Sequence, residues 1–358
     1  MVKTQRNKPL RKKGPVNKGL ILLMAATLLV LAIFAYRIYQ KIYGPNIMLE
    51  DKEYTYLYIP TSSQVEDVYQ LIREKGVVKN LESFKWLAKK KNYPSHVHPG
   101  KYKVHDDMSN NELVERLRAG RQEPVDLIFN NIRTIPQLAG VVSNQIEADS
   151  VDLITLLRDE TYLEQFDMDP QSAPALFIPN TYEFWWDTNA GGFIERMHRE
   201  YQNFWKGEKK KMAGELDMTP VEVTTLASIV DEETIHDGEM PEIAGVYINR
   251  LERGMRLQAD PTIKFAIGDF SIKRVLKKHL QIDSPYNTYK HTGLPPGPIS
   301  IPSIAAIQAV LNYAHHDYLY FVARPDFSGY HNFSETHRQH INNARKYQQA
   351  LNRRDILE

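Results

Sequence analysis

Three consecutive acidic residues, Asp231, Glu232 and Glu233, follow an apolar stretch with the periodicity of a helix. At about 100° per residue, Glu233 points roughly 60° from Val230, on the side of the apolar residues. Asp231 lies about 100° away and Glu232 about 160° away on the same projection. Burial raises the pKa of a carboxyl group, and an acid still protonated near neutral pH is suited to general acid catalysis. We therefore predict a catalytic Glu233; the alternative is a helix end that pairs with an arginine.

Two segments downstream carry polar side chains that suit a cleft beside this acid. The first contains Gln258 and Asp260, and Asp260 stands before a proline, as in the N-cap and first turn of a helix. The second is a proline-rich loop over 284–299 that bears Tyr286 and Asn287. Proline stiffens such a loop, and a stiff loop can hold aromatic faces and amide donors toward a sugar. The alternatives are a simple helix cap and an ordinary packed connection.

Histidines near the C-terminal end raise the question of a metal site. His337 and His340 are one helical turn apart, and His331 and Glu335 are close in sequence. The His-Glu-x-x-His pattern of zinc enzymes is missing. We expect a structural His331 and two exposed helix histidines, and we predict neither a metal site nor a cofactor.

The elements that must position these residues indicate an α+β domain over 122–358. Residues 221–234 and 242–251 have helical periodicity, and the second of these helices exits at Gly254. Upstream, 125–132 has the composition of a strand and 135–145 that of a helix. Glu233 is therefore expected at the end of a helix in a C-terminal catalytic domain.

A smaller unit is predicted over 52–121. Residues 54–59 and 101–104 read as strands, and two amphipathic helices lie between them. A third helix over 110–117 follows the second strand. The predicted order is therefore β-α-α-β with one helix appended.

The N-terminal region predicts a single-pass membrane anchor. Residues 19–36 are almost entirely apolar and would span about 27 Å as a helix, close to a hydrocarbon core of about 30 Å. Residues 1–18 hold seven Lys and Arg and no acid, which predicts a cytoplasmic basic tail. Residues 37–51 are predicted to be a linker. The alternative is a cleaved signal peptide, which the length of the run disfavours.

Composition excludes several classes of protein. Of 358 residues, 42% are hydrophobic and 25% charged, which are values typical of globular chains rather than of disordered or fibrous ones. Without cysteine there is no disulfide and no thiol nucleophile. Of 45 basic and 44 acidic side chains, the part after residue 18 keeps 38 basic against all 44 acidic ones. A body of net negative charge argues against nucleic acid as a partner.

Several long motifs, taken together, resemble one known family. They include the stretch 226–234, the segment 254–262 with its GMRLQADPT sequence, and the SPYNTY and GLPPGPI runs of the loop. They also include FIPNTY at 177–182 and GYHNFSET at 329–336. In their order these motifs resemble the MltG (YceG-like) endolytic murein transglycosylases over roughly residues 50–350. The β-α-α-β unit is similar to the LysM-like module of that family.

The resemblance implies a function. It implies an enzyme that cleaves the glycan strands of peptidoglycan internally, between MurNAc and GlcNAc, and leaves 1,6-anhydro-MurNAc ends. The catalytic glutamate of the family matches Glu233, and Gln258, Asp260, Tyr286 and Asn287 are the candidate substrate-binding residues. The alternatives are a hydrolytic muramidase, with Asp260 as second carboxylate, and a non-catalytic peptidoglycan-binding scaffold.

The resemblance also implies a place in the cell. It implies a protein of the cytoplasmic (inner) membrane, with its N-terminus in the cytoplasm and its catalytic domain on the periplasmic or extracellular side. The expected partners are peptidoglycan strands and peptidoglycan synthases of the penicillin-binding type, beside which the enzyme would end the elongation of nascent glycan.

Overall fold

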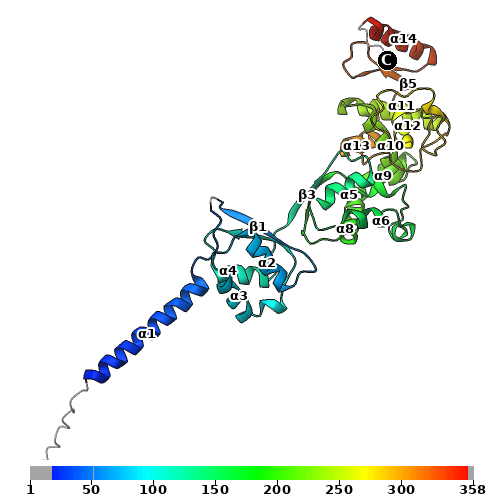
Figure 1. The fold of residues 1–358 in the computed structure, drawn as a ribbon. Coiled ribbons are helices and arrows are strands. Elements are labelled where there is room, and N and C mark those ends of the chain that lie inside the picture. Colours follow the sequence, from blue (N-terminus) through cyan, green and yellow to red (C-terminus); the bar gives the residue numbers. More distant parts are fainter. Residues whose placement is uncertain (1–17, 51, 354–358) are drawn as a thin grey trace, which may run out of the picture. The chain divides into compact units, whose positions relative to one another are not determined.

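The computed structural model describes residues 18–50 and 52–353. Contacts divide the chain into two compact units, Met1–Glu123 and Pro124–Glu358 (Figure 1). Both strands and helices are present, so the mixed α+β class is confirmed. The predicted cytoplasmic tail, apart from Lys18, lies outside the described residues.

Helix α1 (Lys18–Tyr43) is the only helix of the described residues that is long and apolar enough to cross a membrane. It runs past the predicted end of the apolar span at residue 36. Its last turn contacts the folded unit, because the ammonium of Lys41 lies 4.3 Å from the centre of the Trp86 ring. The amide of Asn110 donates to the main-chain oxygen of Lys41 at 2.9 Å.

The segment predicted as a linker, 37–51, differs from that prediction. Its first part is helical, and its second part supplies Ile47 and Leu49 to the hydrophobic core of the first unit. The side chain of Asn46 is also buried and donates to Asn80 and Asn110. The reason is the apolar run from Ile47 to Leu49 after Pro45, in which Ile47 and Leu49 point into the core and Met48 is exposed.

The rest of the first unit has the predicted order. Strands β1 and β2 pair antiparallel, from Tyr54 opposite His105 to Ile59 opposite Gly100. Their inner face is buried against the helices, and tyrosines and lysines occupy the outer face. The elements are β1 (Tyr54–Ile59), α2 (Val65–Lys75), α3 (Leu81–Lys90), η1 (Tyr93–Ser95), β2 (Gly100–His105) and α4 (Asn110–Arg118).

The second unit is mainly helical, with two short antiparallel strand pairs, β3–β4 and β5–β6. One hydrophobic cluster forms around β3, β4, α5 and α8, and another around α10, α11 and α13. The elements are β3 (Val125–Phe129), α5 (Ile135–Ser143), α6 (Ser150–Leu156), α7 (Glu160–Glu164), η2 (Ala173–Leu176), β4 (Asn180–Phe184), α8 (Ala190–Trp205), α9 (Glu208–Glu215), α10 (Pro220–Glu233), η3 (Asp237–Glu239), α11 (Met240–Glu252), α12 (Asp260–Ile267), η4 (His279–Gln281), α13 (Ile304–Leu311), β5 (Tyr320–Ala323), β6 (His331–Ser334) and α14 (His337–Arg353).

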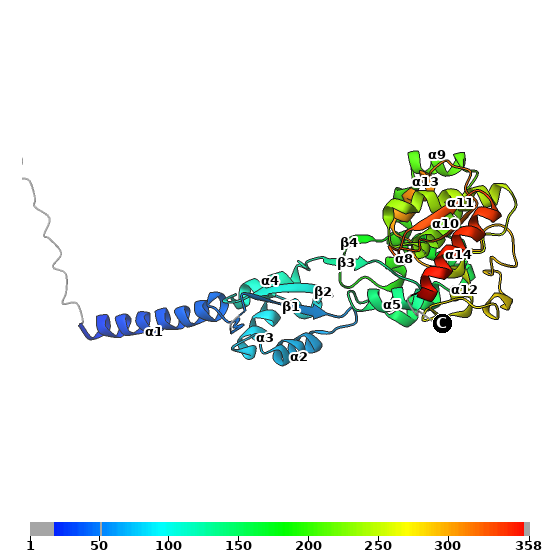
Figure 2. The same cartoon turned by 90° about the horizontal axis from the view of Figure 1, so that it is seen from above.

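Helix α10 lies at the centre of the second cluster (Figure 2). Every residue from Val223 to Val230 is buried, so the helix has no solvent-facing side there. Its polar residues bond within the helix: Thr224 and Thr225 each donate to the carbonyl four residues earlier, and Ser228 donates to the carbonyl of Thr225. The predicted single apolar stripe is therefore too narrow, since neighbours surround this helix on all sides.

Strands β5 and β6 form a ribbon, with Tyr320 opposite Ser334 and Ala323 opposite His331. Helix α14 packs on this ribbon (Figure 2). This arrangement brings residues beyond position 320 next to the end of α10.

Candidate active site

Two of the three acids at the end of α10 each accept two hydrogen bonds from a residue outside the helix. The carboxylate of Asp231 accepts from the main-chain N–H of Ser303 at 3.0 Å and from its hydroxyl at 2.7 Å. The carboxylate of Glu232 forms a two-bond pair with Arg133, with Nε and Nη2 each at 3.0 Å. Both side chains are half-buried, which differs from the outward directions predicted. These two acids tie α10 to α13 and to the loop after β3.

Glu233 is the last residue of α10 and is also half-buried. Its Oε1 accepts one short hydrogen bond, 2.6 Å, from the hydroxyl of the buried Tyr247 on α11. Burial raises the pKa of Glu233 to about 7, and the charge of Asp260 adds to the rise. The bond from Tyr247 and the positive charges of Lys264 and Arg250 oppose it. Near neutral pH this carboxyl group therefore exists in both protonation states, as a proton donor and acceptor must.

Glu233 lies on the wall of a cleft of about 390 Å³, which we call the tyrosine cleft. Its other walls come from α11, the segment before α12, the proline-rich loop, β5 and α14. The lining residues are Glu233, Tyr247, Arg250, Leu257, Gln258, Asp260, Tyr289, Tyr320, Phe321, His337 and His340.

Glu233 also lines a second, larger cleft of about 750 Å³, which we call the acidic cleft. The loops after β3 and before β4, the end of α10 and the start of α13 form it. The lining residues are Asn130, Asn131, Arg133, Pro179, Asp231, Glu232, Glu233, Thr234, Ile235, Asp237, Met240, Ser303, Ala305, Gly329 and His331. Glu233 is the residue that the two clefts share.

Two of the four predicted substrate-binding residues lie in the tyrosine cleft. Asp260 is exposed, and it is the first residue of α12 rather than the N-cap, a position that Ala259 occupies. Its carboxylate instead accepts a 2.6 Å bond from the hydroxyl of Tyr289. Gln258 has a left-handed backbone, with φ of 52°, and its main-chain N–H donates to Thr288. Its exposed side chain is left at the cleft surface.

The other two predicted residues, Tyr286 and Asn287, do not line either cleft. Asn287 is fully buried, and its amide donates to the carbonyls of Leu280 and Ile282. Tyr286 packs on Phe265, with ring centres 4.6 Å apart. These two residues shape the loop that presents Tyr289. The side-chain amide of Asn287, predicted to bind a ligand, donates to main-chain carbonyls instead.

Sequence reasoning missed the residues that the C-terminal part brings to the tyrosine cleft. His337 is exposed as predicted, whereas His340 is half-buried, and both line the cleft. The ring of Tyr320 stacks on that of His340 at 5.4 Å. Burial is the main cause that lowers the pKa of His340, which favours the neutral imidazole. The spacing of His337 and His340 on one helix face was visible in the sequence. The sequence did not show that this face packs on strands β5 and β6.

His331 is engaged by a carboxylate. Its main-chain N–H and its Nδ1 both contact the carboxylate of the buried Glu239, each at 2.7 Å. Glu239 also accepts from the hydroxyl of Thr234 at 3.3 Å. This pair links the connection between α10 and α11 to strand β6. Within residues 18–50 and 52–353, no cluster of three potential ligands is placed to hold a metal ion.

Curated relatives match most of the chain. An endolytic murein transglycosylase of Bacillus subtilis is 29% identical over 334 residues, covering 87% of this chain and 91% of the relative. An endolytic murein transglycosylase of Streptococcus pneumoniae is 29% identical over 343 residues, covering 86% of this chain and 61% of the relative.

The family and the fold agree with these relatives. A crystal structure of a yceG-like protein from Listeria monocytogenes is 27% identical, with a TM-score of 0.55, and the match covers 82% of this chain and 99% of that one. The model of the YceG-like family matches residues 57–346. The chain belongs to the YceG-like family.

Proposed function

We propose that this protein is an endolytic lytic transglycosylase that cleaves peptidoglycan strands between MurNAc and GlcNAc, with Glu233 as its general acid and base. The names of the relatives support the reaction class. The observation that carries the assignment to Glu233 is a half-buried carboxyl group with a pKa of about 7, facing two clefts.

The proposed reaction needs one proton donor and no water. Protonated Glu233 gives its proton to the glycosidic oxygen while the bond from that oxygen to C1 of MurNAc breaks. The C6 hydroxyl of the same sugar then attacks C1 and closes the 1,6-anhydro ring. The Glu233 carboxylate accepts the hydroxyl proton and returns to its starting state. The bond from Tyr247 fixes the direction of the carboxyl group in both steps.

The two clefts support cleavage within a strand. An enzyme that cuts inside a polymer must accommodate sugars on both sides of the broken bond. Because Glu233 lines both the tyrosine cleft and the acidic cleft, a glycan can continue away from it in two directions. A pocket closed behind the acid would fit release of terminal units instead.

Hydrolysis is the second candidate, because Asp260 lies in the same cleft as Glu233. Glycosidases that use water commonly need a second carboxylate. The bond from Tyr289 to Asp260 and the exposure of Asp260 suit an orienting role better than that of a base in a dry site. The chemical nature of the new glycan end separates the two reactions.

The test compares the full-length protein in detergent with its Glu233→Gln variant on purified peptidoglycan, with products read by mass spectrometry. We expect anhydro-MurNAc ends from the unchanged protein alone. Reducing MurNAc ends that depend on Asp260 would identify a hydrolase. Retention of glycan without any product would indicate the binding scaffold.

We further propose that α1 anchors the protein with its N-terminus in the cytoplasm, and that the β-α-α-β unit acts as a LysM-like glycan-binding module. The enzyme would then end nascent strands beside peptidoglycan synthases. The chain lacks cysteine, so one cysteine introduced into either unit can be labelled without background. In intact cells, a membrane-impermeant maleimide should label a cysteine in either unit. Protection of both cysteines would mean that the two units lie in the cytoplasm, opposite to the proposed topology.

A further inference from the structure

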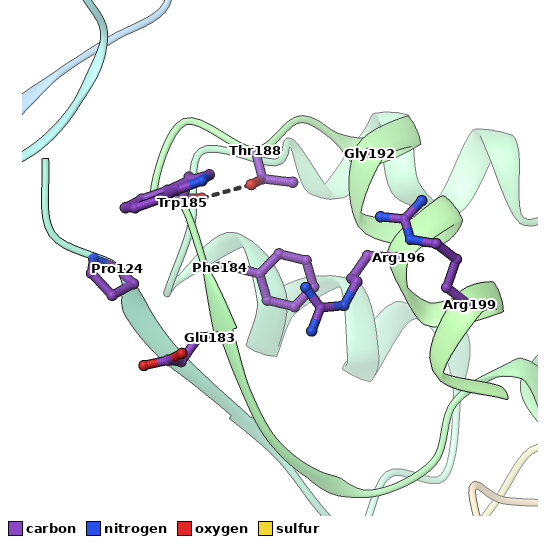
Figure 3. Close-up of a pocket in the computed structure, with 8 residues that line it drawn as sticks. All are labelled: Pro124, Glu183, Phe184, Trp185, Thr188, Gly192, Arg196 and Arg199. Atoms are coloured by element: carbon purple, nitrogen blue, oxygen red, sulfur yellow. Dashed lines mark hydrogen bonds between the residues drawn. The ribbon is translucent and has the colours of Figure 1, made fainter. Parts of the chain in front are cut away.

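A third hollow of the second unit shares no lining residue with either cleft. Figure 3 shows the residues that line it. We call it the arginine recess; its volume is about 370 Å³. The end of β4, the turn after it and the first half of α8 form most of its walls. The lining residues are Pro124, Glu183, Phe184, Trp185, Thr188, Gly192, Arg196 and Arg199.

Two guanidinium groups give the recess its charge. Arg196 and Arg199 are three residues apart on α8 and so leave the same face of the helix (Figure 3). The Nε of Arg196 donates to Glu200 at 2.7 Å, and its guanidinium lies over the ring of Phe184 at 5.8 Å. These two contacts hold the Arg196 guanidinium in place, and its terminal amino groups can still donate to a ligand. Arg199 is exposed and forms no ion pair within the described part of the chain.

An aromatic platform borders these charges. Trp185 is 53% exposed, unusually high for so large an apolar side chain. The turn that presents it is fixed, because Thr188 donates to its carbonyl through both the hydroxyl, at 2.7 Å, and the main-chain N–H, at 3.1 Å. Glu183 leaves the opposite side of the strand from Phe184, and its carboxylate points away from the guanidinium groups (Figure 3). Glu200 pairs with Arg196, so the recess keeps the positive charge of Arg199 beside an apolar face.

Strand β4 connects this recess to the proposed active site. Pro179 lines the acidic cleft, and Trp185, six residues later, lines the recess. An extended chain of six residues covers at most about 20 Å. A peptide of five residues reaches up to about 17 Å when extended. A peptide joined to a sugar in the acidic cleft can thus follow β4 to within about 3 Å of this upper limit, which brings its end next to the recess.

We propose that the arginine recess binds the carboxylate end of a peptide stem carried by the glycan strand. The two arginines bind the carboxylate, a geometry that guanidinium groups favour, and Trp185 covers the apolar side chains of the peptide. This proposal assumes the proposed function, and it adds a preference for peptide-bearing over peptide-free glycan.

The first test compares the cleavage of peptide-bearing strands with that of strands stripped of peptides by an amidase. For the double variant Arg196→Gln/Arg199→Gln we expect KM to rise about tenfold on peptide-bearing strands, with kcat unchanged. On stripped strands we expect no change. The exposed Arg158, outside the recess, supplies the matched control Arg158→Gln. Equal losses on both substrates, or no loss on either, would overturn the proposal.

The second test does not depend on cleavage. A soluble stem pentapeptide with a free C-terminal carboxylate, and the same peptide as an amide, are titrated into the Glu233→Gln variant by calorimetry. We expect the acid to bind about tenfold more tightly than the amide, and this difference to vanish with Arg199→Gln. Trp185→Ala should weaken both peptides. Equal binding of acid and amide would refute the proposal that the recess binds a peptide carboxylate, even if the enzyme cleaves glycan. Tighter binding of the acid would support the proposal even if the protein does not cleave glycan.

Discussion

Two glutamates close together in the chain, the buried Glu239 and the half-buried Glu233, have different surroundings. Glu239 is 5% exposed and accepts from the main-chain N–H and the ring of His331 and from Thr234. Among the residues that the structure describes, Glu233 accepts from Tyr247 alone, and it faces two clefts. The first carboxylate joins two elements, while the second keeps lone pairs and a proton available to a ligand.

The comparison teaches that burial by itself does not identify a catalytic acid. Hydrogen bonds that donate to the charged form offset the cost of burying it. At Glu233 one such bond is too little, so burial dominates and the pKa rises to about 7. The number of donors around a buried acid thus distinguishes a structural role from a chemical one. Matched changes at the two sites test this distinction.

The largest expected effect is on activity at Glu233. Glu233→Gln keeps the shape and removes the proton, so cleavage should fall by about a thousandfold. The rate of anhydro-MurNAc formation measures it. Glu232→Gln, one position earlier, is the control and should cost less than tenfold. Comparable losses of activity in both variants would mean that the acids at the end of α10 have a structural role and that Glu233 is not the proton donor.

The same Glu233→Gln variant should be more stable than the unchanged protein at alkaline pH. The pKa of Glu233 rises from 4.5 to about 7 on folding, so its contribution to stability is full below 4.5 and declines as the pH rises through 7. Removing the ionisable group should raise the free energy of unfolding by up to about 3 kcal/mol at pH 8. Urea unfolding at pH 5 and pH 8 measures the difference, which should be small at pH 5.

At Glu239 the same chemical change should act on stability instead. Glu239→Gln exchanges an acceptor for a donor opposite the N–H of His331, which should lower the free energy of unfolding by about 2 kcal/mol. Thermal unfolding followed by circular dichroism measures it. At a temperature where the variant is folded, activity should stay within about tenfold of normal. A stable but inactive variant would contradict the structural role.

A smaller effect is expected on the pH dependence when Tyr247 is changed. Its hydroxyl stabilises the charged form of Glu233 and so lowers the pKa of that group. In Tyr247→Phe the pKa should rise, and the decline of kcat/KM at alkaline pH should begin at a higher pH than in the unchanged protein, where we expect it near 7. A profile that does not move would remove Glu233 as the titrating acid.

Asp260→Asn should move the same profile the other way and by less. The negative charge of Asp260 raises the pKa of Glu233, so its removal should shift the alkaline decline to lower pH. Tyr289→Phe keeps that charge while removing the hydrogen bond, and it serves as the control. Anhydro-MurNAc ends should persist in Asp260→Asn; their loss together with all cleavage would make Asp260 a second reacting group.

The local sequence predicted the elements well because propensity and periodicity are local properties. The strands and helices of the first unit appear in the predicted order, and Glu233 lies at the end of its predicted helix. The argument from one apolar face was incomplete, since α10 is buried all round. Glu233 accepts one bond, from Tyr247, whereas its two neighbours each accept two, from Arg133 and Ser303, which are far away in the sequence.

The composition of the cleft could not be predicted, because it depends on contacts between distant segments. Asn287 had a residue type suited to sugar binding, yet the tight turns of its own loop use all of its amide group. His340 looked like a surface residue until α14 met the β5–β6 ribbon. Residue types therefore restrict the candidates, and tertiary packing selects among them.

The wall that α14 gives to the tyrosine cleft has a consequence for the timing of synthesis. Tyr320 and His340 follow Glu233 by 87 and 107 residues. At roughly 5–20 residues per second, a ribosome adds His340 about 5–20 s after Glu233. During that interval the cleft beside Glu233 lacks the wall that α14 supplies. The tyrosine cleft is therefore complete only after α14 has been synthesised and has packed on the β5–β6 ribbon.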